Sequence, residues 1–224
     1  MRAVNDTNVA GEMHEVAQMI DSTLPYEPAS EAEAAFVQLI RRARDGDARA
    51  LDELMILSQG RVAATAWRML GSEEDARDAT QEVFLKAFKY LGSFKQEGDF
   101  FAWLYGITVN VCRDMMRQRM RRADRFGPLE AEGGAGALEE LAGPDDVEEA
   151  AIRAQERALV ARALSSLTDK ERAAVVLRDM EGFSAEEVAR ITGSSAGTVR
   201  SQLSSARAKI KTYCVRFLRQ RRGG

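Results

Sequence analysis

Closely spaced helix-start signals in the last third of the chain constrain its fold more than any other feature. Serine or threonine is followed three residues later by glutamate at 168–171 and again at 184–187, which is the capping-box pattern of a helix N-terminus. Ser195 then begins another helix, directly after the glycine-containing turn "TGSS". A short helix over 184–190, a tight turn and a longer helix predict a helix-turn-helix.

The last of these helices has two unlike sides. At about 100° per residue, its apolar side chains gather on one side, namely Val199, Leu203, Ala206 and Ile210. The opposite side carries Arg200, Ser201, Ser204, Ser205, Ala208 and Lys211. An apolar back can seat such a helix on its scaffold while a small polar front enters the major groove of DNA. A plain three-helix bundle with a serine-rich exposed side fits the same pattern.

Helical spacing of apolar residues also dominates the rest of the chain, and the alternation typical of strands is nearly absent. Ser72 with Asp75 resembles a capping box, Gly71 ends the helix before it, and Asp99 can cap a later helix. The expected helices cover about 31–44, 48–57, 62–70, 72–91, 100–120 and 147–164.

These patterns predict an all-α protein of two small helical domains. Residues 1–30 have weak periodicity and contain Pro25 and Pro28, so we expect a flexible N-terminal extension with one short helix at most, over 11–20. The first domain covers 31–122. A glycine-rich, acidic and flexible linker covers 123–150, and the second domain, with the helix-turn-helix, covers 151–224.

Charge is distributed unevenly, although the net charge is only −3. Five arginines crowd the segment 113–122 against one acid, Asp114, and 207–222 carries seven basic residues and no acid. Between them, every charged residue of 129–150 is acidic. Two basic segments separated by an acidic one favour binding to a polyanion. Each basic run fits a solvated helix end equally well.

Several classes of protein are excluded by what the sequence lacks. Cys112, Cys214 and the single histidine, His14, are too few for a zinc site, and we expect neither a metal nor a cofactor. No nucleophile–base pair or phosphate-binding glycine loop points to an enzyme. The longest apolar runs, such as 173–177, are too short to cross a bilayer, and the N-terminus lacks the apolar core of a signal peptide. We therefore expect a cytoplasmic protein without membrane insertion.

Two blocks of the sequence resemble the bacterial extracytoplasmic-function (ECF) sigma factors. The first block, 75–122, begins "DARDATQEVFLKAFKYLGSF", and the second, 164–210, begins "LSSLTDKERAAVVLRDMEGFSAEEVARITGSSAGTVRS". The resemblance covers about 35–122 and 155–216, in the family's order and with its acidic linker between. It implies a transcription initiation factor with no catalysis of its own. It also implies three partners: core RNA polymerase, promoter DNA and an anti-sigma factor.

The resemblance implies where the first domain binds its partners. The family's polymerase contact lies on the pattern "D..QE.F..A", which gives Asp78, Gln81 and Glu82 here, with Phe84 and Phe88 as packing residues. Asn110 falls on the asparagine that contacts a base of the −10 element.

Opening a duplex requires stacking surfaces and phosphate contacts near the flipped bases, and the same segment offers both. Phe100 and Tyr105 can stack on bases, although either ring could belong to the core instead. The arginines that can hold nearby phosphates are Arg113, Arg117, Arg119, Arg121 and Arg122.

The second domain is expected to bind the −35 element through Thr198, Arg200, Ser201, Ser204, Ser205 and Arg207. Many relatives carry longer basic or aromatic residues where this chain has Gln202, Ser204 and Ser205, so DNA shape should contribute a larger share of its readout. In the family, the acidic linker threads through the polymerase cleft, and the resemblance implies the same for the linker of this chain. The alternative is that this linker is an inert tether between the two domains. A stand-alone helix-turn-helix regulator is the alternative for the whole chain, and it would bind DNA tightly without polymerase.

Overall fold

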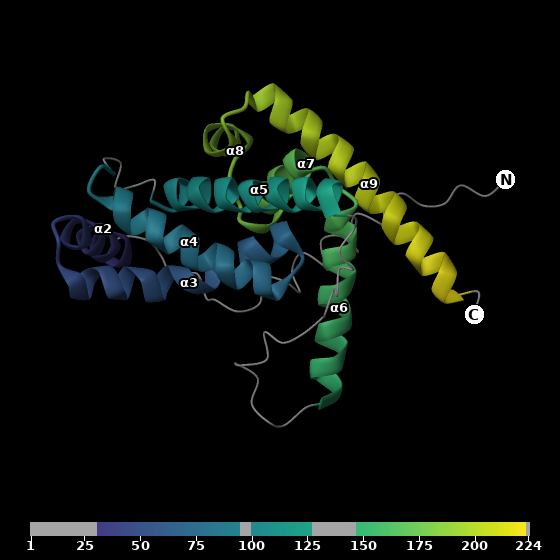
Figure 1. The fold of residues 1–224 in the computed structure, drawn as a ribbon, viewed down its shortest axis with the longest axis horizontal. Helices are drawn as coiled ribbons and strands as arrows, with labels where there is room; N and C mark the ends of the chain where they lie inside the picture. The colour runs from purple at the N-terminus through teal and green to yellow at the C-terminus, as the bar shows by residue number, and fades with distance from the viewer. Residues whose placement is uncertain (1–30, 95–99, 127–146, 223–224) are drawn as a thin grey trace. The chain divides into compact units, whose positions relative to one another are not determined.

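The computed structural model describes residues 31–94, 100–126 and 147–222, and every element assigned in these ranges is helical (Figure 1). The elements in chain order are α2 (Glu31–Arg44), α3 (Ala48–Leu70), α4 (Glu73–Leu91), α5 (Phe100–Phe126), α6 (Val147–Ser165), α7 (Asp169–Val175), the π-helical turn η3 (Val176–Met180), α8 (Ala185–Thr192) and α9 (Ala196–Arg222). This confirms the all-α class. The predicted extension 1–30, its possible helix at 11–20 and the predicted cap Asp99 lie outside the described residues.

One predicted helix boundary is wrong. The expected helices over 48–57 and 62–70 are a single helix, α3. At the predicted break, the Ser58 hydroxyl donates to the carbonyl of Leu54 at 2.7 Å, and Ser58 and Val62 are both fully buried. A glycine inside a helix, such as Gly60, costs only about 1 kcal/mol relative to alanine, and the burial of the neighbouring turns outweighs that cost. The helix ends at Gly71, which has a φ of 71° as a C-cap.

The predicted N-caps Ser72, Thr168 and Ser184, which lie in the described part of the chain, are found where expected. Ser72 accepts a hydrogen bond from the backbone N–H of Asp75 at 3.3 Å. The boxes at 168–171 and 184–187 are complete, because each glutamate also accepts from the backbone N–H of its cap residue. The predicted linker over 123–150 is partly helical, since α5 continues to Phe126 and α6 begins at Val147.

Helices α3, α4 and α5 lie side by side and share one apolar core (Figure 1). Val62, Val83 and Val109 come from these three helices, and none of them is exposed to solvent. Burying each such side chain contributes about 1.5–3 kcal/mol relative to leaving it exposed. This core fixes the positions of the exposed faces of α4 and α5.

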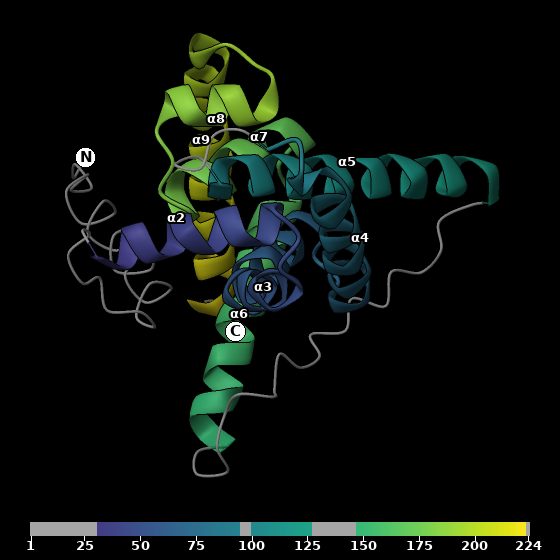
Figure 2. The same cartoon turned by 90° about the vertical axis from the view of Figure 1, so that its left-hand side faces the viewer.

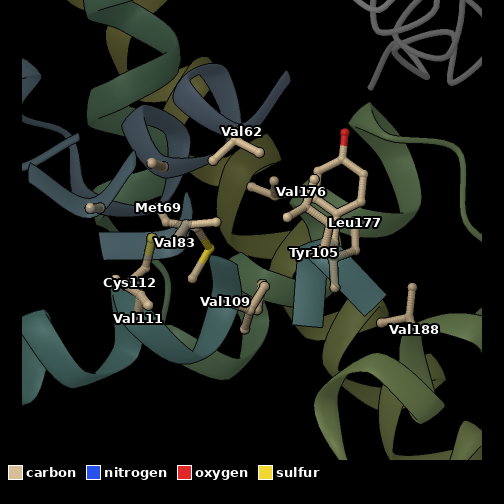
Figure 3. Packing of buried hydrophobic residues seen from close by; sticks show 14 of the residues in the cluster. Val62, Met69, Val83, Tyr105, Val109, Val111, Cys112, Val176, Leu177 and Val188 are labelled. Carbon is tan, nitrogen blue, oxygen red and sulfur yellow. The ribbon is translucent and has the colours of Figure 1, made fainter. Parts of the chain in front are cut away.

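The same core continues into the C-terminal helices. Figure 3 shows Val176, Leu177 and Val188 from this part of the chain with Val62 and Tyr105 from α3 and α5, and all five belong to one cluster of buried residues. Helix α5 contacts α8, and α3 contacts α7. Helices from the two predicted domains therefore pack against each other, while the domain boundaries themselves stay predictions.

A largely buried carboxylate strengthens this packing. Glu181, between η3 and α8, accepts hydrogen bonds from Thr65 Oγ1 at 2.8 Å, from Arg68 Nη1 at 2.6 Å and from the Tyr105 hydroxyl. The exposed fractions of the Glu181 and Arg68 side chains are only 10% and 17%. A charge this far from water needs such partners. Glu181 therefore ties the C-terminal helices to α3 and α5.

Candidate nucleic-acid and polymerase interface

The C-terminal helices α8 and α9 form the predicted helix-turn-helix (Figure 2). Gly193 ends α8 with a φ of 64°, a left-handed conformation that suits glycine. The Ser195 hydroxyl then accepts from the backbone N–H of Thr198 at 3.1 Å and caps α9. Val199 and Ala206 are fully buried on the scaffold side, as the periodicity predicted. The turn and the buried stripe thus fix which side of α9 faces outward.

All six residues predicted to contact the −35 element are exposed on α9, namely Thr198, Arg200, Ser201, Ser204, Ser205 and Arg207. The structure therefore brings these residues together on the outward side of one helix. Their contact with DNA stays a prediction.

Two acids that no local sequence pattern indicated flank this face. Arg200 pairs with Glu186 of α8 at 2.5 Å, and Arg207 pairs with Asp179 of η3 at 2.6 Å. The Arg207–Asp179 hydrogen bonds raise the pKa of the guanidinium further. Any phosphate that Arg200 or Arg207 bound would therefore have to compete with these carboxylates.

A third acid, Glu171 of α7, lies on the other flank of α9. It accepts from Ser205 Oγ at 2.6 Å and from Lys209 Nζ at 2.7 and 2.8 Å. These hydrogen bonds, with Lys209 as the largest cause and Ser205 next, lower the pKa of Glu171 to about 2. The sequence indicated Glu171 only as a capping residue, because its partners on α9 are more than thirty residues away.

Helix α5 carries the residues predicted for the −10 element, and some of them are accessible. Asn110, Arg117 and Arg121 are exposed. Arg117 pairs with Asp114, one turn away on the same helix. Arg113 is half-buried, and burial lowers the pKa of its guanidinium. The exposed side of α5 therefore offers one amide and a run of cations.

The two aromatic rings predicted to stack on bases are buried in this structure. Phe100 packs edge-on against Phe94 and Phe36, with ring centroids 5.9 and 5.8 Å apart. Tyr105 packs edge-on against Phe183, with centroids 5.2 Å apart, and burial raises the pKa of its hydroxyl. Both rings would have to leave the core before they could stack on a base. Their role at the −10 element stays a prediction.

The residues predicted to contact polymerase lie on the exposed side of α4. Asp78, Gln81 and Glu82 are all exposed. Phe88 was expected to pack against the core, yet 64% of it is exposed. Leu85, which lies between Glu82 and Phe88 in the chain, is 66% exposed. The apolar stripe of α4 is thus wider than the surface that α3 and α5 cover. An exposed apolar patch next to polar residues is typical of a protein-binding surface.

Two other kinds of site, a metal centre and a membrane span, are absent from residues 31–94, 100–126 and 147–222. These ranges hold no group of three or more His, Cys, Asp or Glu side chains that could bind a metal ion. None of the helices described is long and apolar enough to span a bilayer. Cys112 is buried and burial raises the pKa of its thiol to about 12, so it is a poor nucleophile.

This helical protein exposes a helix-turn-helix, a basic side of α5 and a mixed polar and apolar side of α4, and surfaces of these kinds are typical of proteins that bind other macromolecules. Comparison with known families agrees with this class. The model described as Sigma-70 region 2 matches residues 55–122, and the model described as Sigma-70, region 4 matches residues 157–210.

Individual relatives and solved structures give the same assignment. The ECF RNA polymerase sigma-E factor of Escherichia coli K12 is 35% identical over 81% of this chain and 95% of its own length, and the RNA polymerase sigma-H factor of Pseudomonas aeruginosa is 32% identical over 82% and 95%. CnrH, solved with the cytosolic domain of CnrY, matches 80% of this chain and 96% of its own with a TM-score of 0.57 and 29% identity. The sigma factor RpoE, solved with the anti-sigma factor NepR from Bartonella quintana, matches 73% and 95% with a TM-score of 0.58 and 25% identity. The chain belongs to the ECF family of RNA polymerase sigma factors.

Proposed function

We propose that the chain is a transcription initiation factor that binds core RNA polymerase in the cytoplasm and recognises the −10 and −35 promoter elements. One observation carries the proposal: region 2 and region 4 of the sigma-70 family match in order on one chain. The proposed function needs no catalytic residue and no cofactor in this chain, because polymerase supplies the chemistry.

The exposed surfaces supply a separate contact for each partner. On α4, Asp78, Gln81 and Glu82 with the apolar neighbours Leu85 and Phe88 form the proposed polymerase-binding surface. A small apolar hollow between α3, α4 and α5, lined in part by Phe84 and Phe88, continues this surface. Mixed surfaces of this kind bury apolar side chains at the centre of a protein interface and keep polar side chains at its rim.

The proposed DNA contacts lie on α5 and α9. On α5, Asn110 can pair with the edge of a flipped −10 base, while Arg113, Arg117 and Arg121 approach the phosphates. On α9, the exposed serines and Thr198 can approach base edges and phosphates of the −35 duplex, and Arg200 and Arg207 contribute charge. Melting follows when contacts with the unpaired strand replace base stacking.

Regulation by an anti-sigma factor is part of the proposal. Both solved structures described above contain a second protein: CnrH is in complex with the cytosolic domain of CnrY, and RpoE is in complex with NepR, which is named as an anti-sigma factor. The exposed apolar residues of α4 that polymerase would cover are also accessible to such a partner.

The experiment that tests the proposed function is run-off transcription by core RNA polymerase reconstituted with this chain on genomic DNA, followed by sequencing of the transcript starts. We expect starts that depend on the chain and share two upstream elements. A stand-alone regulator would instead bind promoter DNA as tightly without polymerase as with it, and would direct no new starts.

A further inference from the structure

One serine on the outward side of α9 has an unusual hydrogen-bond partner. Hydroxyl side chains within a helix often donate to the carbonyl four residues earlier, and Thr192 and Thr212 of this chain do so at 2.7 and 2.9 Å. Ser205 instead contacts Glu171 of α7, with 2.6 Å between Oγ and Oε1. A neighbouring helix therefore sets the direction of the Ser205 hydroxyl.

The carboxylate of Glu171 is held firmly in the ionised form. Lys209 Nζ contacts both of its oxygens, and the backbone N–H and hydroxyl of Thr168 each donate to Oε2 at 2.9 Å. Only 9% of the Glu171 side chain is exposed. The pKa near 2 agrees with this set of donors. An ionised carboxylate has no proton to donate, so the hydrogen bond must run from Ser205 to Glu171.

This direction leaves Ser205 as an acceptor toward solvent. Its only hydroxyl proton is committed to Glu171, while its oxygen keeps a lone pair and the residue is exposed. In the major groove, the donors are the N4 amine of cytosine and the N6 amine of adenine, whereas guanine and thymine present acceptors. A serine held in this way can pair with cytosine or adenine but not with guanine or thymine.

We propose that Ser205 discriminates in favour of cytosine or adenine at the base it contacts in the −35 duplex, and that Glu171 is the positioning residue that makes Ser205 an obligate acceptor. This inference rests on the proposed function, because it requires α9 to lie in the major groove. Glu171 itself touches no base: it acts through the hydroxyl of Ser205.

The test uses the full chain assembled with core RNA polymerase on duplex promoter DNA. At each −35 position, cytosine or adenine is replaced by its N4- or N6-methylated form, which keeps base pairing and removes the amine hydrogen that faces the groove. With the parent chain, methylation at one position should weaken promoter binding about fivefold, the usual range of one hydrogen bond. With Ser205→Ala that loss should disappear. Ser204→Ala is the matched control, because the described hydrogen bonds of Glu171 go to Ser205, Lys209 and Thr168 and not to Ser204, and it should keep the loss.

A second pair of variants separates positioning from simple helix capping. The amide of Glu171→Gln can donate as well as accept, so Ser205 becomes able to donate to a base. The base preference at its position should then fall toward equal affinity for the four base pairs. Lys209→Met removes the ion pair but leaves an ionised Glu171 to accept from Ser205, so the preference should persist. A cap with no positioning role would leave the preference unchanged in both variants.

The outcomes distinguish this inference from the proposed function. If the polymerase binds the promoter with the parent chain but Ser205→Ala alters no base preference, or alters one for guanine or thymine, the inference is wrong and the proposed function stands. If the parent chain directs no promoter binding by polymerase at all, the proposed function is wrong and the inference fails with it. Should Glu171→Gln fail to fold, the comparison of Ser205→Ala with Ser204→Ala still decides.

Discussion

Glu181 accepts hydrogen bonds from Thr65, Arg68 and Tyr105, so Glu181→Ala should leave three donors without their partner at once. Thr65 and Tyr105 are buried, and each stranded hydroxyl should cost about 1 kcal/mol or more. Arg68 loses its counter-charge while 17% of its side chain is exposed, so it can recover part of its hydration. Removing one partner of a buried ion pair usually costs about 3–5 kcal/mol. We therefore expect a loss of about 3 kcal/mol in the free energy of unfolding.

The assay is equilibrium unfolding of the full chain in urea and by heat, followed by far-ultraviolet circular dichroism. For a chain of this length, 1 kcal/mol corresponds to about 2–4 °C in Tm, so Glu181→Ala should lower Tm by about 6–12 °C. Tyr105→Phe removes a single hydroxyl and should cost about 1 kcal/mol. The matched control is Glu186→Ala, because Glu186 and Arg200 are each 63% exposed and such pairs contribute less than about 1 kcal/mol. If Glu181→Ala were no more destabilising than Glu186→Ala, the reasoning about this buried carboxylate would be refuted.

Three further predictions concern the proposed interfaces and pH. Asn110→Ala should weaken open-complex formation, measured by permanganate footprinting, while polymerase binding in a pull-down stays nearly intact, because the side chain is exposed and its proposed contact is with a −10 base and not with polymerase; an equal loss of both would mean a structural role. Arg200→Ala should reduce promoter affinity about fivefold to tenfold in a gel-shift titration with polymerase, because it removes a cation from the face proposed to lie on the −35 duplex; a parent chain whose promoter affinity did not change when the −35 element was scrambled would contradict the placement of this helix. Because the pKa of Glu171 falls from 4.5 to about 2 on folding, its ionised form stabilises the fold fully above about pH 4.5 and progressively less as the pH falls toward 2. The difference in urea stability between the parent chain and Glu171→Gln should therefore be present at neutral pH and shrink on acidification, and a difference that stayed constant would count against the ion pair as its source.

Local signals in the sequence were sufficient for much of the fold. Several features depend on residues within one or two helical turns of each other, namely the N-caps at 168–171 and 184–187, the glycine turn at Gly193 and the buried stripe of α9. Such patterns are visible in a sequence because the interacting groups are neighbours in the chain. The helix-turn-helix and the exposed side of α9 could therefore be predicted with the correct residues.

The predictions that were wrong concern properties that depend on what each helix packs against. The break predicted near Gly60 ignored the burial of the turns on either side of it, and the packing predicted for Phe88 ignored how narrow the surface covering α4 is. Periodicity indicates that a helix has an apolar side but does not give the width of the surface that covers it. Likewise, the contacts of Glu171 and Glu181 join residues that are far apart in the sequence, so no local pattern indicated them.

The separation between Glu181 and its partners also has a consequence for synthesis of the chain. Thr65 lies 116 residues before Glu181. At about 5–20 residues per second, the ribosome needs roughly 6–23 s to add that stretch. From the time each is synthesised until Glu181 is added, Thr65, Arg68 and Tyr105 can hydrogen-bond only to water or to temporary partners. The nascent helices α3 and α5 therefore keep these three side chains hydrated, and their final packing waits until Glu181 has been synthesised.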